Sequence, residues 1–223
     1  MGTDSKAKTP RLITPIFRVS FPEVFQKKQF DESQPARWSL TGLFTPSEFT
    51  EKDKQLWKAI GAAVNALCKE NIKKPYNEVT GSWWPIVPTA RPGASAQYRM
   101  PFHAGEEKTY KGYGPGIVFF TMAATKKKPE VVGLNKEPIT ENSEDAFYAG
   151  CYARASVNPY WFDNKGKGVA IGLSNLQKLR DGERLDSFSS AEEDFGDDAG
   201  EYGGTDDMSE GGDEAGGDFD PTA

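Results

Sequence analysis

The last 38 residues of the chain, Asp186 to Ala223, hold 14 acidic residues and neither Lys nor Arg, and they are rich in Gly. A segment with so few apolar residues cannot bury enough surface to offset the entropy lost on ordering, and its like charges repel. We therefore expect residues 186–223 to be a disordered tail. Residues 1–185 remain as the part that can fold, a length that suits one domain with a sizeable core.

The two parts of the chain also differ in net charge. The whole chain has 27 basic and 33 acidic residues, whereas residues 1–185 keep 27 basic against 19 acidic residues, a net charge of +8. A basic domain attracts polyanions such as nucleic acids. An acidic tail can imitate such a polyanion within the same chain, or bind another protein.

Alternating apolar and polar residues predict strands at residues 11–21 and 37–44. The side chains expected to face inward are Ile13, Phe17, Val19 and Phe21 in the first strand and Trp38, Leu40 and Phe44 in the second; those expected to face outward are Thr14, Arg18 and Ser20, and Arg37, Ser39 and Thr41. A continuous apolar run at residues 116–124 predicts a further strand that is covered on both faces.

A long helix is predicted between the strands 37–44 and 116–124. It can begin at Thr45–Glu48 or at Thr50–Asp53, because each stretch has a Thr as N-cap and an acidic residue three positions later. The apolar residues that recur at helical spacing are Leu56, Trp57, Ile60, Ala63, Val64 and Leu67, and the helix is expected to end near Asn71.

Residues 148–173 predict a β-hairpin with a turn at Asp163–Gly166. The inward side chains are expected to be Cys151, Ala153, Ala155, Val157, Val169, Ile171 and Leu173; the opposite face carries Tyr152, Arg154, Ser156, Asn158 and Tyr160, with a break near Pro159. We expect residues 174–179 to form a short helix. The predicted fold class is mainly β with one long helix, a small barrel with loop elaborations.

The residues that most enzymes use are sparse in this chain. The chain has one His, His103, in a loop, and its two cysteines, Cys68 and Cys151, are too far apart in sequence to form a zinc-ligand cluster with it. The glycines of residues 164–172 lack the spacing of a phosphate-binding loop. We expect both cysteines to be reduced core residues and expect no catalysis, no cofactor and no metal. With no run of about 18 apolar residues and no signal peptide in residues 1–11, we expect a cytoplasmic protein without a membrane segment.

Aromatic residues beside cations are the positive functional signal. Single-stranded nucleic acid offers unstacked bases that stack on rings, and phosphates that attract Lys and Arg. The candidate binding residues are Arg91, Tyr98, Arg99, Tyr110, Lys111, Tyr113, Lys126, Lys127, Lys128, Tyr152, Arg154, Tyr160, Trp161, Lys165 and Lys167. The alternative for each is packing or solvation, and the pair Trp83 and Trp84 is assigned to packing. The loop 91–113 and the hairpin 152–167 can each supply the main site, or both can line one groove.

The tail ends with an aromatic residue between acids, Asp218, Phe219 and Asp220. Such a segment can dock in a basic, partly apolar pocket of a partner. It can also lie in the basic groove of its own domain until DNA displaces it, because the tether keeps its local concentration high. A tail that only aids solubility is the alternative.

The stretch YAGCYARASVNPYWFDNKGKGVAIGLSNLQKLRDGERL, residues 148–185, together with the β-rich body and the acidic tail, resembles phage-encoded single-stranded DNA-binding proteins of the OB fold. The resemblance implies an OB-type barrel with Tyr152, Arg154 and Tyr160 on the binding strand, and a tail that recruits polymerase, helicase or recombination proteins. Two features depart from it: Pro221 to Ala223 follow the tail aromatic, and the helix comes after the second predicted strand rather than the third.

These observations together predict a non-enzymatic single-stranded DNA-binding protein of phage replication, recombination and repair, in the cytoplasm of the host cell. A different class stays open: an acidic-tailed interaction protein, or a DNA mimic, that binds a basic partner. A nuclease would require a metal-ligand cluster that the sequence lacks. The sequence leaves open an RNA target and a homodimer.

Overall fold

The computed structural model describes residues 11–30, 32, 35–80, 98–164 and 166–185. Trp83, Trp84, Arg91 and Lys165 lie outside the described residues, as does the whole tail from Asp186 to Ala223.

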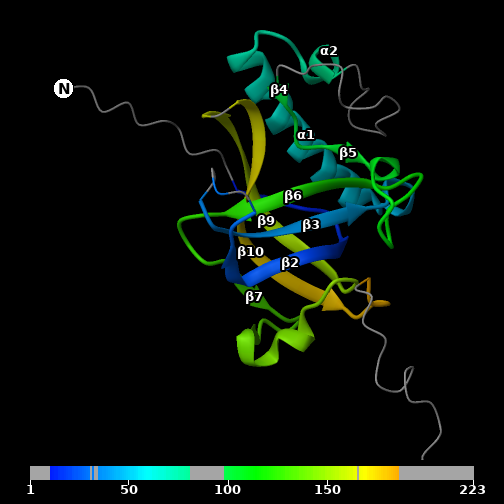
Figure 1. Ribbon diagram of the computed structural model, residues 1–223. Helices are drawn as coiled ribbons and strands as arrows, with labels where there is room; N and C mark the ends of the chain where they lie inside the picture. Colours follow the sequence, from blue (N-terminus) through cyan, green and yellow to red (C-terminus); the bar gives the residue numbers. More distant parts are fainter. Residues whose placement is uncertain (1–10, 31, 33–34, 81–97, 165, 186–223) are drawn as a thin grey trace, which may run out of the picture. The chain divides into compact units, whose positions relative to one another are not determined.

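The longer strands pair in a cycle. They are β2 (Phe17–Lys28), β3 (Arg37–Phe44), β6 (Val118–Ala124), β9 (Tyr152–Asp163) and β10 (Lys167–Arg180). The sheet runs β9–β2–β3–β6–β10, and β10 also pairs with β9, so the hydrogen-bonded ladder returns to the strand where it began. The β6–β10 pairing is parallel and the others are antiparallel. Figure 1 shows β6, β3 and β2 side by side, with helix α1 (Glu51–Asn71) above them.

Shorter strands and helices lie before and between the longer strands in the chain. They are β1 (Leu12–Ile13), η1 (Pro46–Glu48), α2 (Tyr76–Thr80), β4 (Tyr98–Arg99), β5 (His103–Ala104), η2 (Gly105–Glu107), β7 (Glu130–Val132), β8 (Pro138–Ile139) and η3 (Glu141–Ala146). Strand β4 extends the edge of β10 in parallel, and β5 pairs with β6. The fold is thus mainly β with few helices, as the sequence predicted.

The core is aromatic at its centre. The rings of Phe44 and Phe120 stack with centroids 4.6 Å apart, and the rings of Phe17 and Trp57 lie 5.3 and 5.0 Å from Phe44. Trp57 belongs to α1, whose buried side chains therefore cover this part of the sheet. Cys68 and Cys151 are both buried and unpaired, as expected.

The first turn of α1 decides between the two predicted helix starts. Thr50 is the N-cap, and it exchanges hydrogen bonds with Asp53 in a capping box, whereas residues 46–48 form only a 3-10 turn. The Asp53 carboxylate also accepts a bond of 3.4 Å from the Ile16 amide, which ties the helix to the chain just before β2. The helix ends at Asn71, as predicted.

The predicted strand 11–21 is corrected in both extent and orientation. Pro15 separates β1 from β2, and β2 has a bulge between Ser20 and Glu23 where Phe21 adopts a φ of 48°. The bulge changes the alternation of side chains, so Phe21 is 51% exposed instead of inward. Ile13 is also exposed, whereas Thr14 and Ser20, predicted outward, are buried. The Thr14 hydroxyl accepts a hydrogen bond from the Ala155 amide, which offsets the cost of burying it.

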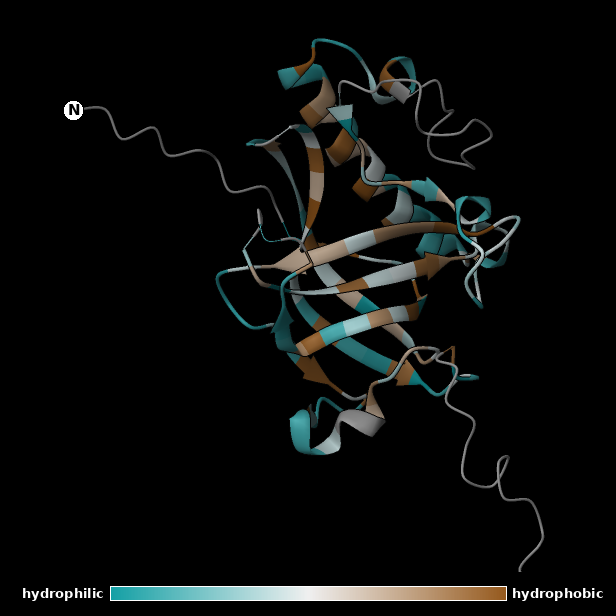
Figure 2. Ribbon diagram, in the orientation of Figure 1, coloured by the Kyte–Doolittle hydropathy of each residue, from teal (hydrophilic) through white to brown (hydrophobic). Residues whose placement is uncertain are grey.

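Strand β3 has the predicted bounds, but its second face is not open. Ser39 and Thr41 are buried, and the Thr41 and Thr121 hydroxyls share a hydrogen bond of 3.1 Å across β3 and β6. Figure 2 shows β6 as white to brown, whereas the turn that follows it is hydrophilic. The predicted strand is present, but it is not fully covered on both faces, because Thr121 is exposed and Ala123 is only partly buried.

The predicted hairpin is present, but two details of its sequence interpretation are wrong. Residues 174–179 continue β10 instead of forming a helix, because they pair with both β9 and β7, and bulges at Leu173/Asn175 and Lys178/Arg180 interrupt the alternation that marks a strand. Pro159 does not break β9 either. It lies beyond the β1–β9 pairing, which ends at Val157, so its missing N–H removes no bond to a described strand on that edge.

Within the described residues, no helix is both long enough and apolar enough to cross a membrane.

Candidate nucleic-acid interface

Five rings form a continuous series across β2, β5, β6 and the segment 108–116, which we call the aromatic row. Its members are Phe21, Tyr110, Tyr113, Phe119 and His103, and successive ring centroids lie 5.3, 5.9, 5.1 and 5.2 Å apart. The two rings at one end, Phe21 and Tyr110, are 51% and 55% exposed. The bulge in β2 is what turns Phe21 outward to meet Tyr110.

Tyr113 anchors the row to the sheet. It is half-buried, and its hydroxyl donates a hydrogen bond of 3.2 Å to Ser20 Oγ. Burial raises the pKa of Tyr113 above its ordinary value, so the phenol stays neutral and remains a donor. Tyr113 is therefore a support, whereas the neighbouring Tyr110 is available to a ligand.

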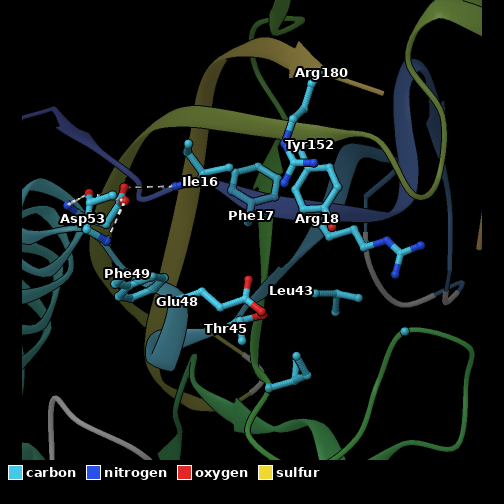
Figure 3. Close-up of a pocket in the computed structure, with 13 residues that line it drawn as sticks. Ile16, Phe17, Arg18, Leu43, Thr45, Glu48, Phe49, Asp53, Tyr152 and Arg180 are labelled. Carbon is cyan, nitrogen blue, oxygen red and sulfur yellow. Dashed lines mark hydrogen bonds between the residues drawn. The ribbon is translucent and has the colours of Figure 1, made fainter. Parts of the chain in front are cut away.

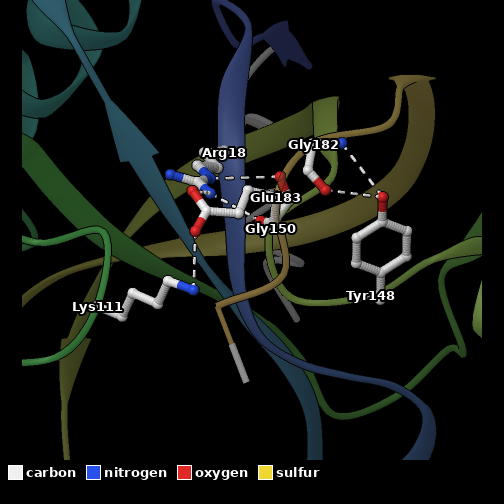
Figure 4. Close-up of polar contacts among 6 residues, drawn as sticks. All are labelled: Arg18, Lys111, Tyr148, Gly150, Gly182 and Glu183. Carbon is white, nitrogen blue, oxygen red and sulfur yellow. Dashed lines mark hydrogen bonds and ion pairs between the residues drawn. The ribbon is translucent and has the colours of Figure 1, made fainter. Parts of the chain in front are cut away.

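Two cations lie beside the row and share one carboxylate (Figure 4). Lys111 Nζ is 2.9 Å from Glu183 Oε1, and Arg18 Nη2 is 3.7 Å from Glu183 Oε2. The Lys111 ammonium, followed by the Arg18 guanidinium, lowers the pKa of Glu183 below its ordinary range. Glu183 is therefore ionised at neutral pH and offsets one of the two positive charges.

A second group of predicted residues meets at the tip of the β9–β10 hairpin. Tyr98 lies beside Trp161 with ring centroids 6.1 Å apart, because β4 pairs with the start of β10. A Cβ added at Gly168 would overlap the carbonyl of Arg99, so only glycine allows this close approach of β4. Lys167 forms an ion pair of 3.3 Å with Asp163. Arg99 is exposed, whereas Trp161 is half-buried against the core.

The outer face of β9 carries three predicted binding residues, of which Tyr152 and Arg154 already contact other side chains. The Arg180 guanidinium lies 3.6 Å from the centroid of the Tyr152 ring, and Arg154 Nε donates to Gln177 Oε1 over 2.8 Å. Tyr160, further along β9, is 41% exposed. Tyr152 is thus covered on one face by a cation, and Tyr160 is the more accessible ring of this face.

A cavity of about 340 Å³ lies next to the Tyr152–Arg180 pair (Figure 3). Arg18 and Arg180 reach it from β2 and β10, whereas Phe49 and Glu48 line it from the side of η1. Arg180 forms no ion pair with any residue that the structure describes.

Lys126, Lys127 and Lys128 occupy the turn between β6 and β7. This turn does not join two paired strands, because β7 pairs with β10 and β8, not with β6. Lys127 and Lys128 pair with Glu130 and Glu141 at 3.0 and 2.7 Å. Within the described ranges only Lys126 of the three has no ion-pair partner, so the run contributes less free charge than its sequence indicates.

Sequence reasoning missed several cation–aromatic contacts. They are Lys27 over Trp38, Lys28 and Arg37 near Phe30, Lys178 and Arg184 over Tyr148, and Arg180 over Tyr152. Most of these partners are distant in the chain, so a search for aromatic and basic residues adjacent in the sequence could not find them. Strand register is the signal that would have been needed.

His103 has a packing role. Its ring stacks on Phe119, its Nδ1 lies 3.1 Å from Glu107 Oε2, and it lies in strand β5 instead of the predicted loop. No three His, Cys, Asp or Glu side chains gather around a common point in the part of the chain that the structure describes.

The chain is similar to known phage proteins in sequence and in fold. A curated phage protein, "Putative protein p50" of Acyrthosiphon pisum secondary endosymbiont phage 1, is 27% identical over 188 residues, which cover 79% of this chain and 92% of the relative. The solved single-stranded DNA-binding protein of bacteriophage Enc34, in complex with single-stranded DNA, has a similar fold, with a TM-score of 0.56 and 15% identity over 78% of this chain and 88% of that chain. Its C-terminally truncated form gives a TM-score of 0.56 and 16% identity over 77% and 87%.

The family model described as "Enterobacter phage Enc34, ssDNA-binding protein" matches residues 10–208, which is most of the chain. This match confirms the resemblance noted in the sequence. The chain therefore belongs to the family of the phage Enc34 single-stranded DNA-binding protein.

Proposed function

We propose that this protein binds single-stranded DNA and has no enzymatic activity. The observation that carries the proposal is the exposed end of the aromatic row, Phe21 and Tyr110, beside the cations Lys111 and Arg18, in a member of this family. Rings and cations within reach of each other supply the two contacts that a single strand needs and a duplex uses less well, because a duplex hides its base faces.

The mechanism combines stacking with charge neutralisation. Each base that stacks on a ring contributes about 1–3 kcal/mol, and every base has a face to offer, so sequence preference is low. Each phosphate that a Lys or Arg contacts releases counterions, which makes the affinity fall as salt rises. One domain of this kind covers about 4–16 nucleotides.

The tip of the β9–β10 hairpin is the second part of the proposed surface. Tyr98, Arg99, Trp161 and Lys167 lie there, and Tyr160 lies next to Trp161 on the outer face of β9. In the turn after β6, Lys126 to Lys128 add positive charge, of which Lys127 and Lys128 are paired with glutamates. The closed pairing cycle supports an OB-type barrel with the exposed Tyr160 and Arg99 on its outside. In that barrel, α1 follows the second strand of the cycle, which is the departure already visible in the sequence.

The acidic tail, residues 186–223, has two proposed roles. It competes with DNA for the basic domain, and its tip, Asp218, Phe219 and Asp220, recruits replication or recombination proteins such as a polymerase or helicase in the host cytoplasm. Removing residues 186–223 then tightens DNA binding. An unchanged or weaker affinity of residues 1–185 contradicts the competition.

Fluorescence anisotropy of a labelled oligo-dT, titrated with the full chain across salt concentrations, tests the main proposal. We expect salt-sensitive binding that an unlabelled single strand reverses and that a duplex of equal length reverses poorly. Equal competition by the duplex, or no binding by either the full chain or residues 1–185, overturns it. In the latter case the tail and its protein partner become the place to look for the activity.

A further inference from the structure

The Glu183 carboxylate lies where Lys111 and Arg18 converge (Figure 4). Lys111 directly follows Tyr110 in the chain, and the exposed ring of Tyr110 packs against Phe21. Arg18 is also held by the backbone, because its Nη2 donates 2.7 Å to the Glu183 carbonyl oxygen and its Nε donates 3.4 Å to the Gly150 carbonyl oxygen. Both cations thus have the Glu183 carboxylate as an ion-pair partner in the free protein.

The segment that carries this carboxylate, residues 181–185, is attached at both sides of Glu183. The Tyr148 hydroxyl donates to the Gly182 carbonyl oxygen and accepts from the Gly182 amide, and the Leu185 amide donates to the Ala149 carbonyl oxygen. A Cβ added at Gly112 would touch the Leu185 side chain, so the segment also lies against the loop that bears Lys111. These contacts hold the backbone on both sides of Glu183, so its side chain starts close to the two cations.

A carboxylate between a guanidinium and an ammonium has the charge and the acceptor geometry of one phosphate group of a nucleic acid backbone. The side chains of Glu183 and Lys111 are 70% and 55% exposed, and exposed ion pairs of this kind are weak. Because Lys111 directly follows Tyr110 in the chain, a strand that stacks a base on Tyr110 would bring a phosphate near Lys111, whose carboxylate partner also contacts Arg18. That phosphate can therefore compete with the carboxylate.

We propose that Arg18 and Lys111 form a binding site for one phosphodiester group of the DNA strand, and that Glu183 occupies this site in the free protein and is displaced on binding. The inference rests on the proposed single-stranded DNA binding. It concerns a residue that precedes the acidic tail, so it holds whether or not the tail competes. Arg18 is a residue that the sequence did not mark as a ligand for DNA.

The test compares Glu183→Gln with Glu51→Gln in the full chain. Glu51 is an exposed glutamate of α1 that pairs with Lys54 at 2.6 Å, so both variants remove one negative charge, and they break one ion pair at Glu51 and two at Glu183. We expect Glu183→Gln to tighten oligo-dT binding about two- to fivefold relative to Glu51→Gln. Equal affinities of the two variants, or a weaker affinity of Glu183→Gln, overturn the inference.

A double variant separates displacement from a general change in charge. In a Lys111→Gln background, Glu183→Gln should give less gain than it gives in the wild-type background, because one of the two cations that it liberates is absent. A gain of the same size in both backgrounds overturns the shared site. If the wild-type chain shows no preference for the single strand, the proposed function fails, whereas preserved preference with equal variants overturns only the Glu183 site.

Discussion

The Arg180 guanidinium rests on the ring of Tyr152, with its central carbon 3.6 Å from the ring centroid (Figure 3). Tyr152 also faces Arg18 in the pairing of β2 with β9. One aromatic ring therefore brings two arginines from different strands to the same cavity. The pair presents positive charge and little free aromatic face, which changes the expected role of Tyr152 from base stacking to support of a cation.

Arg180→Gln should flatten the salt dependence of DNA binding. Arg180 has no ion-pair partner among the described residues, so its charge is available to a phosphate. Loss of one phosphate contact reduces the slope of log K against log salt by about 0.7 for a single strand. Anisotropy titrations at four salt concentrations measure this slope, with Lys54→Gln on α1 as the matched control. If both variants keep the wild-type slope of log K against log salt, Arg180 does not contact a phosphate of the DNA.

Tyr110→Ala should weaken oligo-dT binding far more than Tyr152→Phe does. Tyr110 is 55% exposed and stands at the open end of the aromatic row, so its loss removes a stacking ring. One stacked base corresponds to about 5- to 150-fold in affinity. Tyr152→Phe keeps the ring beneath Arg180, and its affinity should stay near wild type. An affinity of Tyr110→Ala as close to wild type as that of Tyr152→Phe would mean that Tyr110 is not a main stacking ring.

Thr50→Ala should lower stability without changing DNA affinity. The Thr50 side chain accepts the Asp53 amide as the N-cap of α1, and the capping box is lost with it. The expected cost is about 1 kcal/mol, which corresponds to a fall in Tm of about 2–4 °C for a chain of this size. Differential scanning calorimetry measures it, with the exposed Thr125→Ala as control. A Tm equal to that of the control contradicts the structural role of the cap.

Stability should fall as the pH rises above 9. Burial raises the pKa of Cys68 to about 11, and it also raises the pKa of Cys151. A group whose pKa is raised by folding keeps its full stabilising contribution below its unfolded pKa and loses it as the pH rises toward the folded value. Urea unfolding of the wild type and of Cys68→Ala between pH 8 and 11 tests this. The variant should lose less stability than the wild type over that range, and identical losses contradict the assignment to Cys68.

Much of the fold followed from local patterns. The bounds of β3, the end of α1 and the inward residues of the β9–β10 hairpin were all predicted, because alternation and helical spacing act within a single element. The bulge at Phe21 and the length of β10 were not predicted. A bulge changes the alternation at one residue, and β10 is recognised as a strand only through its partners β9 and β7.

The candidate site was predictable in part. Tyr110, Lys111 and Tyr113 were selected because ring and cation are neighbours in the sequence, and they do lie together. Phe21 and Arg18 join them only through the bulge in β2 and the return of the chain at Glu183. Whether a candidate ring is exposed also depends on packing, as the half-buried Trp161 and the covered Tyr152 illustrate.

The most direct test of the central claim is photo-crosslinking of the full chain to an oligonucleotide that carries 5-iodo-deoxyuridine, followed by mass spectrometry of the crosslinked peptides. The account predicts crosslinks at Tyr110 or Phe21, with further ones at the hairpin tip near Tyr98, Tyr160 or Trp161. An oligonucleotide that binds the chain but crosslinks at none of these rings would contradict it.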